Sequence, residues 1–87
     1  MNVFVVTLDG REDPGAPALT VLAFVAARDE ADAGARAAAE LERIGWSDIR
    51  ARRTGELVDE AALPEDFRDA VAGARRYGVH LIIYDET

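Results

Sequence analysis

The sequence predicts an α+β domain built as a two-layer sandwich, in which two helices cover one face of a four-stranded mixed sheet. Two observations lead to this fold class. Four short segments are rich in β-branched and aromatic residues, and two segments between them place small and apolar residues at helical spacing. The 87 residues suffice for a single domain, residues 1–87. The expected order of elements is β-β-α-β-α-β.

The first two strands are expected at residues 3–8 and 19–26. Both segments are apolar at nearly every position, which is typical of central strands that are buried on two faces. Residues 9–18 between them contain two prolines, two glycines and four charged residues, so they are expected to form a loop. Two apolar runs joined by one loop most often pair antiparallel.

An alanine-rich segment after Asp29 predicts the first helix, since alanine is the best helix former. The Asp29 carboxylate can accept hydrogen bonds from the free N–H groups of the first turn. Gly45 is expected to end the helix in the left-handed conformation and to bring Trp46 back onto Leu41. The helix has a stripe of mostly small residues: Gly34, Ala37, Ala38, Leu41 and Ile44.

Residues 47–58 predict a third strand with one polar face, which favours an edge position. A right-handed crossover through the first helix would make it parallel to the second strand. Strict alternation puts Arg50 and Arg52 on one face and Arg53 on the other. These arginines form an anion or acidic-partner site, or they protect an edge strand from aggregation, and we favour protection. Gly55 is expected to mark a bulge or the end of the strand.

Pro64 is expected to open a second helix and Gly78 to close it. Residues 79–84 predict the last strand, whose hydrophobicity favours an interior position in the sheet, and residues 85–87 form a polar tail. The apolar stripe of this second helix contains Phe67, Ala70, Val71, Ala74 and Tyr77.

The predicted helices are too few to cover both apolar faces of the sheet, and this indicates a binding surface. Three of the four strands are apolar on both faces, whereas two short helices on one side can cover only one face. A large apolar patch left in water usually marks a partner or ligand surface, so we expect the second face to pack against another copy of the chain. The alternative is that the long loop or residues 55–63 fold over this face and bury it within one chain. This candidate interaction face contains Thr20, Leu22, Phe24, Arg50, Arg52, His80, Ile82 and Tyr84.

The charge balance excludes several functional classes. The net charge is −7, and all ten basic residues are arginine, so a general nucleic-acid binder is not expected. The absence of cysteine excludes a disulfide or a thiolate metal site. No apolar stretch is long enough to cross a membrane, and no signal peptide is recognised, so we expect a cytoplasmic protein. The bias toward alanine, glycine and arginine favours a bacterial source with a GC-rich genome.

Few residues suggest chemistry. His80 is the only histidine, and Tyr84 on the same strand face lies two strand steps, roughly 13 Å, away, which is too far for a hydrogen bond. The loop acids Asp9, Glu12 and Asp13 do not have calcium-loop spacing. No glycine-rich phosphate loop follows a strand, and Trp46 after a helix-ending glycine favours a structural contact over a stacking platform. We therefore expect no cofactor and no metal.

Three functional classes remain open. The favoured one is a non-catalytic protein-interaction or homodimeric module that binds through the helix-free sheet face. The second is an acidic antitoxin or immunity-like inhibitor of a basic partner, since the β-β-α-β start resembles, in topology only, several small bacterial domains of those types. The third is a small dimeric enzyme or ligand binder with a pocket at the sheet face that uses His80, Tyr84 and Arg50.

Overall fold

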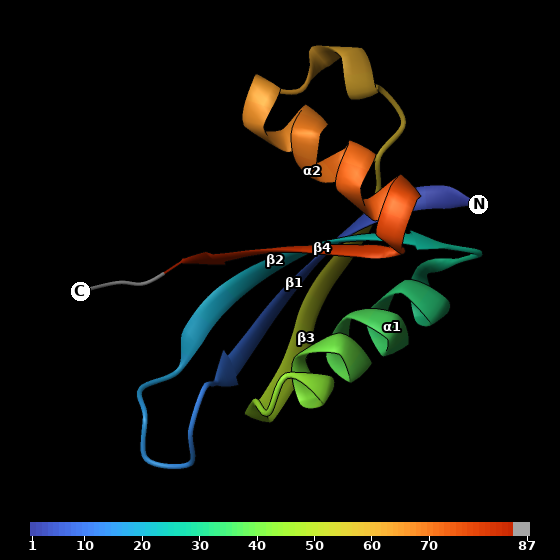
Figure 1. The fold of residues 1–87 in the computed structure, drawn as a ribbon. Helices are drawn as coiled ribbons and strands as arrows, with labels where there is room; N and C mark the ends of the chain where they lie inside the picture. Colours follow the sequence, from blue (N-terminus) through green and yellow to red (C-terminus); the bar gives the residue numbers. More distant parts are fainter. Residues whose placement is uncertain (85–87) are drawn as a thin grey trace.

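The α+β class and the order of elements are confirmed by a computed structural model, which describes residues 1–84 (Figure 1). The predicted polar tail at residues 85–87 lies outside the described residues. The elements are β1 (Asn2–Arg11), β2 (Leu19–Ala27), α1 (Glu30–Arg43), β3 (Ser47–Glu56), the short 3-10 helix η1 (Glu60–Ala62), α2 (Glu65–Tyr77) and β4 (Val79–Tyr84).

The four strands form one sheet in the order β3-β1-β2-β4. Every hydrogen-bonded neighbour in it is antiparallel, so the prediction of a mixed sheet is wrong. The expected parallel orientation of β2 and β3 is confirmed, because both run antiparallel to β1 and therefore point the same way. The crossover carries the chain past β1 rather than to the free side of β2, so the two parallel strands are not neighbours.

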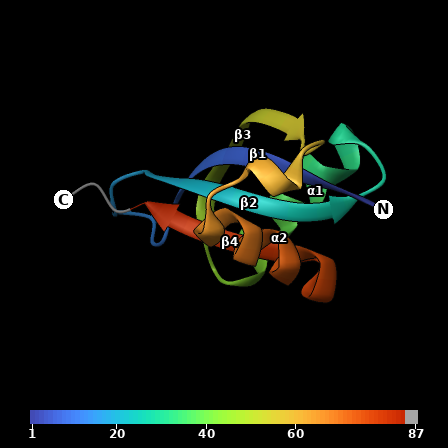
Figure 2. The ribbon, with the colours of Figure 1, turned by 90° about the horizontal axis from the view of Figure 1, so that it is seen from above.

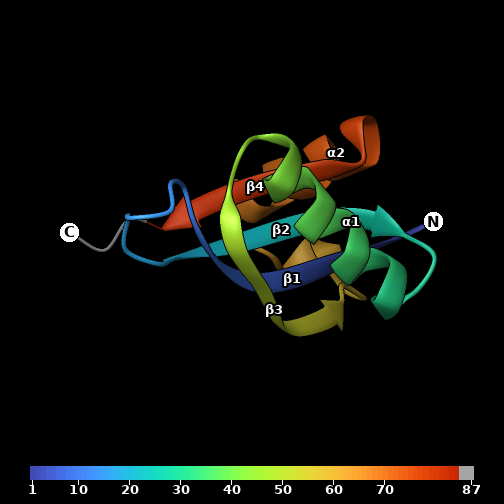
Figure 3. The same ribbon diagram turned by 90° about the horizontal axis from the view of Figure 1, so that it is seen from below.

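The two helices lie on opposite faces of the sheet, so the prediction that both cover one face is wrong (Figure 1). α2 overlies the sheet in the view from above, and α1 crosses it in the view from below (Figures 2 and 3). The physical reason lies in β1 and β2, which are apolar on both faces and need cover on both. One inclined helix for each face buries more of these side chains than two helices side by side.

The α1-side core is the larger of two hydrophobic clusters. Small residues on the buried stripe of α1 let the helix approach β1 and β2 closely, and Trp46 closes one end of the cluster. The predicted stripe is displaced by part of a turn, because Ala33 is buried whereas Ile44 is 45% exposed. The buried members of this core are Phe4, Val6, Leu8, Val21, Ala23, Val25, Ala27, Ala33, Ala37, Leu41 and Trp46.

The α2-side core lies on the other face and is smaller. The apolar stripe of α2 supplies three of its five buried residues, as predicted, although Tyr77 in that stripe is 76% exposed. Leu57 and Leu63, in the connection between β3 and α2, pack against its margin. Its buried members are Val3, Phe24, Ala70, Val71 and Ala74.

The predicted ends of α1 are confirmed. The Asp29 carboxylate accepts a hydrogen bond from the backbone N–H of Asp32 at 2.8 Å. At the other end, Gly45 has a φ of 96°, and the N–H of Trp46 donates to the carbonyl of Leu41 at 3.0 Å. These bonds close the helix as a glycine-terminated cap and turn the indole of Trp46 into the α1-side core.

β4 lies at an edge of the sheet, so the prediction of an interior position is wrong. Apolar side chains of β4 are partly buried by the packing of the two helices, not by a second neighbouring strand. Val79 and Leu81 pack against the α1-side core, while Ile82 packs against the α2-side core. Hydrophobicity on both faces of a strand therefore reports cover on both faces and does not decide whether the strand is central or at an edge.

The close packing of β1 on Trp46 predicts the effect of Gly10→Ala. A Cβ at Gly10 would lie 2.9 Å from Cε3 of Trp46, so the indole must shift. We expect a loss of about 1–3 kcal/mol in the free energy of unfolding. Urea unfolding, followed by the fluorescence of this single tryptophan, measures it. Gly15→Ala is the control, because its Cβ would meet nothing within 4 Å, and an equal loss in both variants would contradict the explanation.

Asp32 predicts a pH dependence of stability. Its carboxylate accepts hydrogen bonds from the backbone N–H of Arg28 at 3.1 Å and from Nε of Arg36 at 3.0 Å, and these bonds hold its pKa below the ordinary value. Because the pKa of Asp32 is lower in the folded state, its ionised carboxylate stabilises the fold at pH values above the unfolded-state pKa. This stabilisation is lost as the pH falls through the folded-state pKa. Asp32→Asn should therefore lower Tm at neutral pH, and the difference should close below about pH 4. A difference that stays constant with pH would contradict this.

Candidate interaction surface

The face of the sheet that α2 covers has three rows of side chains, each running across all four strands. Residues that pair directly across neighbouring strands share a face, so the strand registers define the rows. The covered row is Gly55, Val5, Phe24 and His80; the middle row is Arg53, Thr7, Leu22 and Ile82; and the far row is Arg50, Asp9, Thr20 and Tyr84. All the predicted interaction-face residues except Arg52 fall in these rows.

Within the covered row, α2 covers Val5 and Phe24, whereas Gly55 and His80 at the two ends of the row are exposed. Phe24 is only 1% exposed, and its ring lies 5.5 Å from that of Phe67 between centroids, with the two planes tilted by 48°. Such tilted aromatic pairs stabilise packing by about 0.5–1.5 kcal/mol beyond area burial. Phe24 is therefore part of the α2-side core, and the expectation that it lies on a helix-free surface is wrong.

His80 lies against the backbone of α2. A Cβ built on Gly73 would lie 2.6 Å from Nδ1 of His80, so the imidazole occupies space that only glycine leaves open. Tyr84, the proposed partner for catalysis, is two rows away on the same strand, and Asp85 lies outside the described residues. Within residues 1–84 the ring of His80 therefore has a packing role against the helix.

The remaining predicted residues lie at or beyond the margin of α2. Leu22 and Ile82 of the middle row are half-buried against the α2-side core. In the far row Thr20 is partly exposed and Tyr84 is 42% exposed. The structure thus divides the predicted face into a part under α2 and an open end, defined here as the far row with its neighbours Arg52, Arg53 and Thr7.

A bulge in β3 changes the direction of the arginine side chains. The register between β1 and β3 slips by one residue between Thr7 and Leu8, which leaves Arg52 as the extra residue. Arg53 then pairs with Thr7 and Arg50 with Asp9, so both share the face of α2. The expectation that Arg53 points the other way is wrong, because alternation cannot reveal an inserted residue. Of the two roles expected for Gly55, a bulge or the end of the strand, the bulge lies instead at Arg52, and the strand ends at Glu56, one residue after Gly55.

Arg52 forms an ion pair and hydrogen bond with Asp9. A second pair, between Arg11 and Asp48 at 3.2 Å, lies beside it. Both pairs line a hollow of about 390 Å³ between the start of β3 and the end of β1, and Arg50 lines it as well. Arg50 and Arg53 have no acidic partner within residues 1–84.

The free edge of β4 is the other feature of this surface. The N–H of Ala26 donates to the carbonyl of Gly78 at 2.9 Å, which fixes the phase of the ladder between β2 and β4. Bonded and non-bonded pairs alternate in an antiparallel ladder. The N–H and C=O groups of Val79, Leu81 and Ile83 therefore point away from β2, toward the open side of the sheet.

The described part of the chain contains no obvious place for a metal, since no three His, Cys, Asp or Glu side chains come together within residues 1–84. Neither α1 nor α2 is long and apolar enough to cross a membrane. Trp46 is 8% exposed in the α1-side core, which gives it the structural role that we favoured.

Comparisons with protein-family models, curated proteins and solved structures find no match to this chain.

The contact between α2 and β4 predicts a coupling between Gly73 and His80. Alanine in place of a mid-helix glycine normally stabilises by about 1 kcal/mol. In Gly73→Ala the new Cβ displaces His80, so this gain should be absent or reversed, and it should return in the background of His80→Ala. Urea unfolding of the four proteins of this double-mutant cycle measures a coupling of about 0.5–3 kcal/mol.

Gly34→Ala in α1 is the matched control for that cycle, because its Cβ would meet nothing within 4 Å. It should stabilise the protein whichever residue stands at position 80. Additive effects of the Gly73 and His80 substitutions would show that the imidazole does not rest on the helix.

Proposed function

We propose that this chain is a non-catalytic protein-interaction module that works as a two-fold homodimer, in which the two sheets join along β4. The single observation that carries the proposal is the unpaired edge of β4, with its outward backbone groups. This proposal moves the contact from the sheet face, where the sequence suggested it, to the sheet edge, because α2 covers much of that face.

The two edges of the sheet differ in how they are protected. β3 has the arginines at positions 50, 52 and 53 and a bulge, which are devices that prevent pairing with other chains. β4, from Val79 to Tyr84, contains no acidic residue and no arginine. An unprotected apolar edge with free backbone groups favours addition of a strand.

Exposed apolar side chains on and next to β4 support the same contact. Ile83 is 44% exposed and Tyr84 is 42% exposed on the strand itself, and Tyr77 at the end of α2 is 76% exposed. Burial of these side chains in a dimer would add to the thin hydrophobic stabilisation of a domain of this size.

A second copy fits this edge because an antiparallel strand pair is self-complementary about a two-fold axis. An axis at Leu81 pairs Val79 of each chain with Ile83 of the other, so that outward groups meet outward groups. Each chain has a net charge of −7, and two copies repel. β4 lets them meet at a strand without formal charge, which keeps that repulsion low.

The enzyme alternative finds less support in the geometry. Arg50 and Tyr84 are at opposite ends of the far row, three strand spacings or about 14 Å apart. His80 is in another row, where it is exposed and contacts α2 at Gly73. The three side chains do not converge on one cavity, and the reading as a small ligand-converting enzyme lacks the assembled groups that such a site needs.

A charge at the edge of β4 tests the dimer. We expect the wild-type protein to sediment with twice the mass of one chain, and Ile83→Lys to raise the dimer Kd by at least about tenfold, because the junction would bury a lysine opposite Val79 of the other chain without an acidic partner. Val58→Lys is the matched control, since Val58 is 86% exposed and outside β4. Sedimentation equilibrium over about a hundredfold range of concentration measures both.

A single introduced cysteine gives a second measurement, because the chain has none of its own. A Cα separation of about 5.5 Å for a bonded antiparallel pair is within disulfide range, so Leu81→Cys should form a covalent dimer on oxidation, whereas Val58→Cys should not. A wild-type protein that stays monomeric throughout the concentration range would refute the homodimer.

A further inference from the structure

Arg50 and Arg53 are two neighbouring cations without acidic partners in a strongly acidic chain. The sequence has 17 acidic residues and only ten basic ones. Six of the arginines form ion pairs within residues 1–84, whereas these two are exposed and form none there. The overall acidic composition does not explain why these two neighbouring guanidinium groups have no acidic partner.

The bulge sets their direction. In a regular strand without a bulge, side chains alternate, so Arg50 and Arg53, three residues apart, would point to opposite faces of β3. The register slip instead places them opposite Asp9 and Thr7, on one face and in adjacent rows. Arg52 at the same time forms an ion pair with Asp9, the acidic residue directly opposite Arg50 on β1. The open end thereby keeps a local excess of positive charge.

The spacing of these cations indicates an extended ligand. Asp9 and Thr7 are two residues apart on β1, so their partners on β3 are separated by about 7 Å along the strand direction. Alternate side chains of an extended peptide point to one side with the same repeat of about 7 Å. Carboxylates at alternate positions of such a peptide can reach both guanidinium groups, each through paired N–H donors.

The neighbouring surface suits a peptide as well. Thr7, which is partly exposed, pairs directly with Arg53, and half-buried Leu22 follows in the middle row. Thr20, also partly exposed, lies in the far row on the other side of Asp9 from Arg50. The hollow lined by Arg50 adds room for a bound chain at the start of β3. The overall charge of −7 disfavours a ligand with a charge at every unit, such as a nucleic acid, more than a peptide in which neutral residues separate the carboxylates.

We propose that the open end of the α2 face binds an extended acidic segment of a partner protein, with carboxylates at alternate positions on Arg50 and Arg53. This inference goes beyond the homodimer. β3 and β4 are the opposite edges of the sheet, so joining two copies along β4 leaves both arginine pairs free. A homodimer would present two identical sites to its partner.

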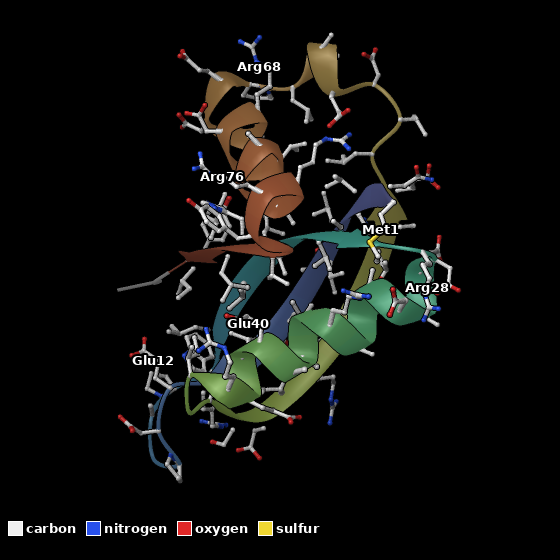
Figure 4. The ribbon with its side chains drawn as sticks, turned by 45° about the vertical axis from the view of Figure 1, so that its right-hand side comes forward. Met1, Glu12, Arg28, Glu40, Arg68 and Arg76 are labelled. Carbon is white, nitrogen blue, oxygen red and sulfur yellow. The ribbon has the colours of Figure 1, made fainter. Side chains whose placement is uncertain are left out.

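The test uses a fluorescent peptide of about ten residues that alternates Glu with Thr, titrated with the full chain at low ionic strength. We expect saturable binding, and a Kd that rises at least about tenfold in R50Q/R53Q because two charge-assisted contacts are lost. The matched control is R68Q/R76Q, which makes the same change of charge on α2. Arg68 and Arg76 also lack an ion pair within residues 1–84, and Arg68 extends from the side of α2 that faces away from the sheet (Figure 4). The control should change Kd less than about twofold.

Each other outcome overturns the proposal. Absence of saturable peptide binding would rule out the site. Equal loss of peptide affinity in both double variants would show that only the net charge of the protein matters. Tighter binding of a single-stranded oligonucleotide of equal charge, lost in the same variant, assigns the arginines to nucleic acid instead. Unchanged peptide affinity with new high-mass assemblies in R50Q/R53Q shows that the arginines only protect the edge of β3. The mass of each variant is measured in parallel, so failure of the homodimer is detected separately from failure of this site.

Discussion

β1 and β2 are apolar on both faces, and the rest of the fold is organised around covering both. Side chains that alternate along each strand go to two separate cores, one under α1 and one under α2. The order of elements along the chain makes this possible, because α1 follows β2 and crosses one face of the sheet, whereas α2 follows β3 and crosses the other. Each helix then needs only a narrow stripe of small residues to approach the sheet, which alanine and glycine provide.

The division of cover between two faces also decides what remains available for partners. Had both helices covered one face, the other would be a broad apolar plane suited to sheet-on-sheet packing. With one helix on each face, the free apolar surface contracts to the edge of β4, and the uncovered far row beside it is mostly polar. The surface that remains is narrow, and it combines backbone hydrogen-bonding groups with a few side chains of distinct chemistry, so it favours extended strands over flat faces.

Local patterns in the sequence predicted much of this fold. The ends of α1 follow from Asp29 and Gly45, whose side-chain and backbone preferences act over a single turn, and alternation placed Ile82 on the same face of β4 as His80 and Tyr84. The larger errors concern relations between distant segments. Which face α2 covers, which edge β4 occupies and how β3 pairs with β1 depend on the connection as a whole, and the bulge at Arg52 leaves no mark in a run of arginines. Seven of the eight residues of the candidate face lie on the α2 side of the sheet, but Phe24 is buried there, and the role of this face in binding stays a prediction.

The composition of the α1-side core has a consequence for the order of assembly. All its buried residues lie between Phe4 and Trp46, so the first half of the chain contains a nearly complete nucleus of its own. Hairpin, helix and glycine cap in that half are close in sequence, and contacts between such segments form quickly. During synthesis this nucleus can fold while α2 and β4 are still inside the ribosome, and the later half then docks onto a template that already exists.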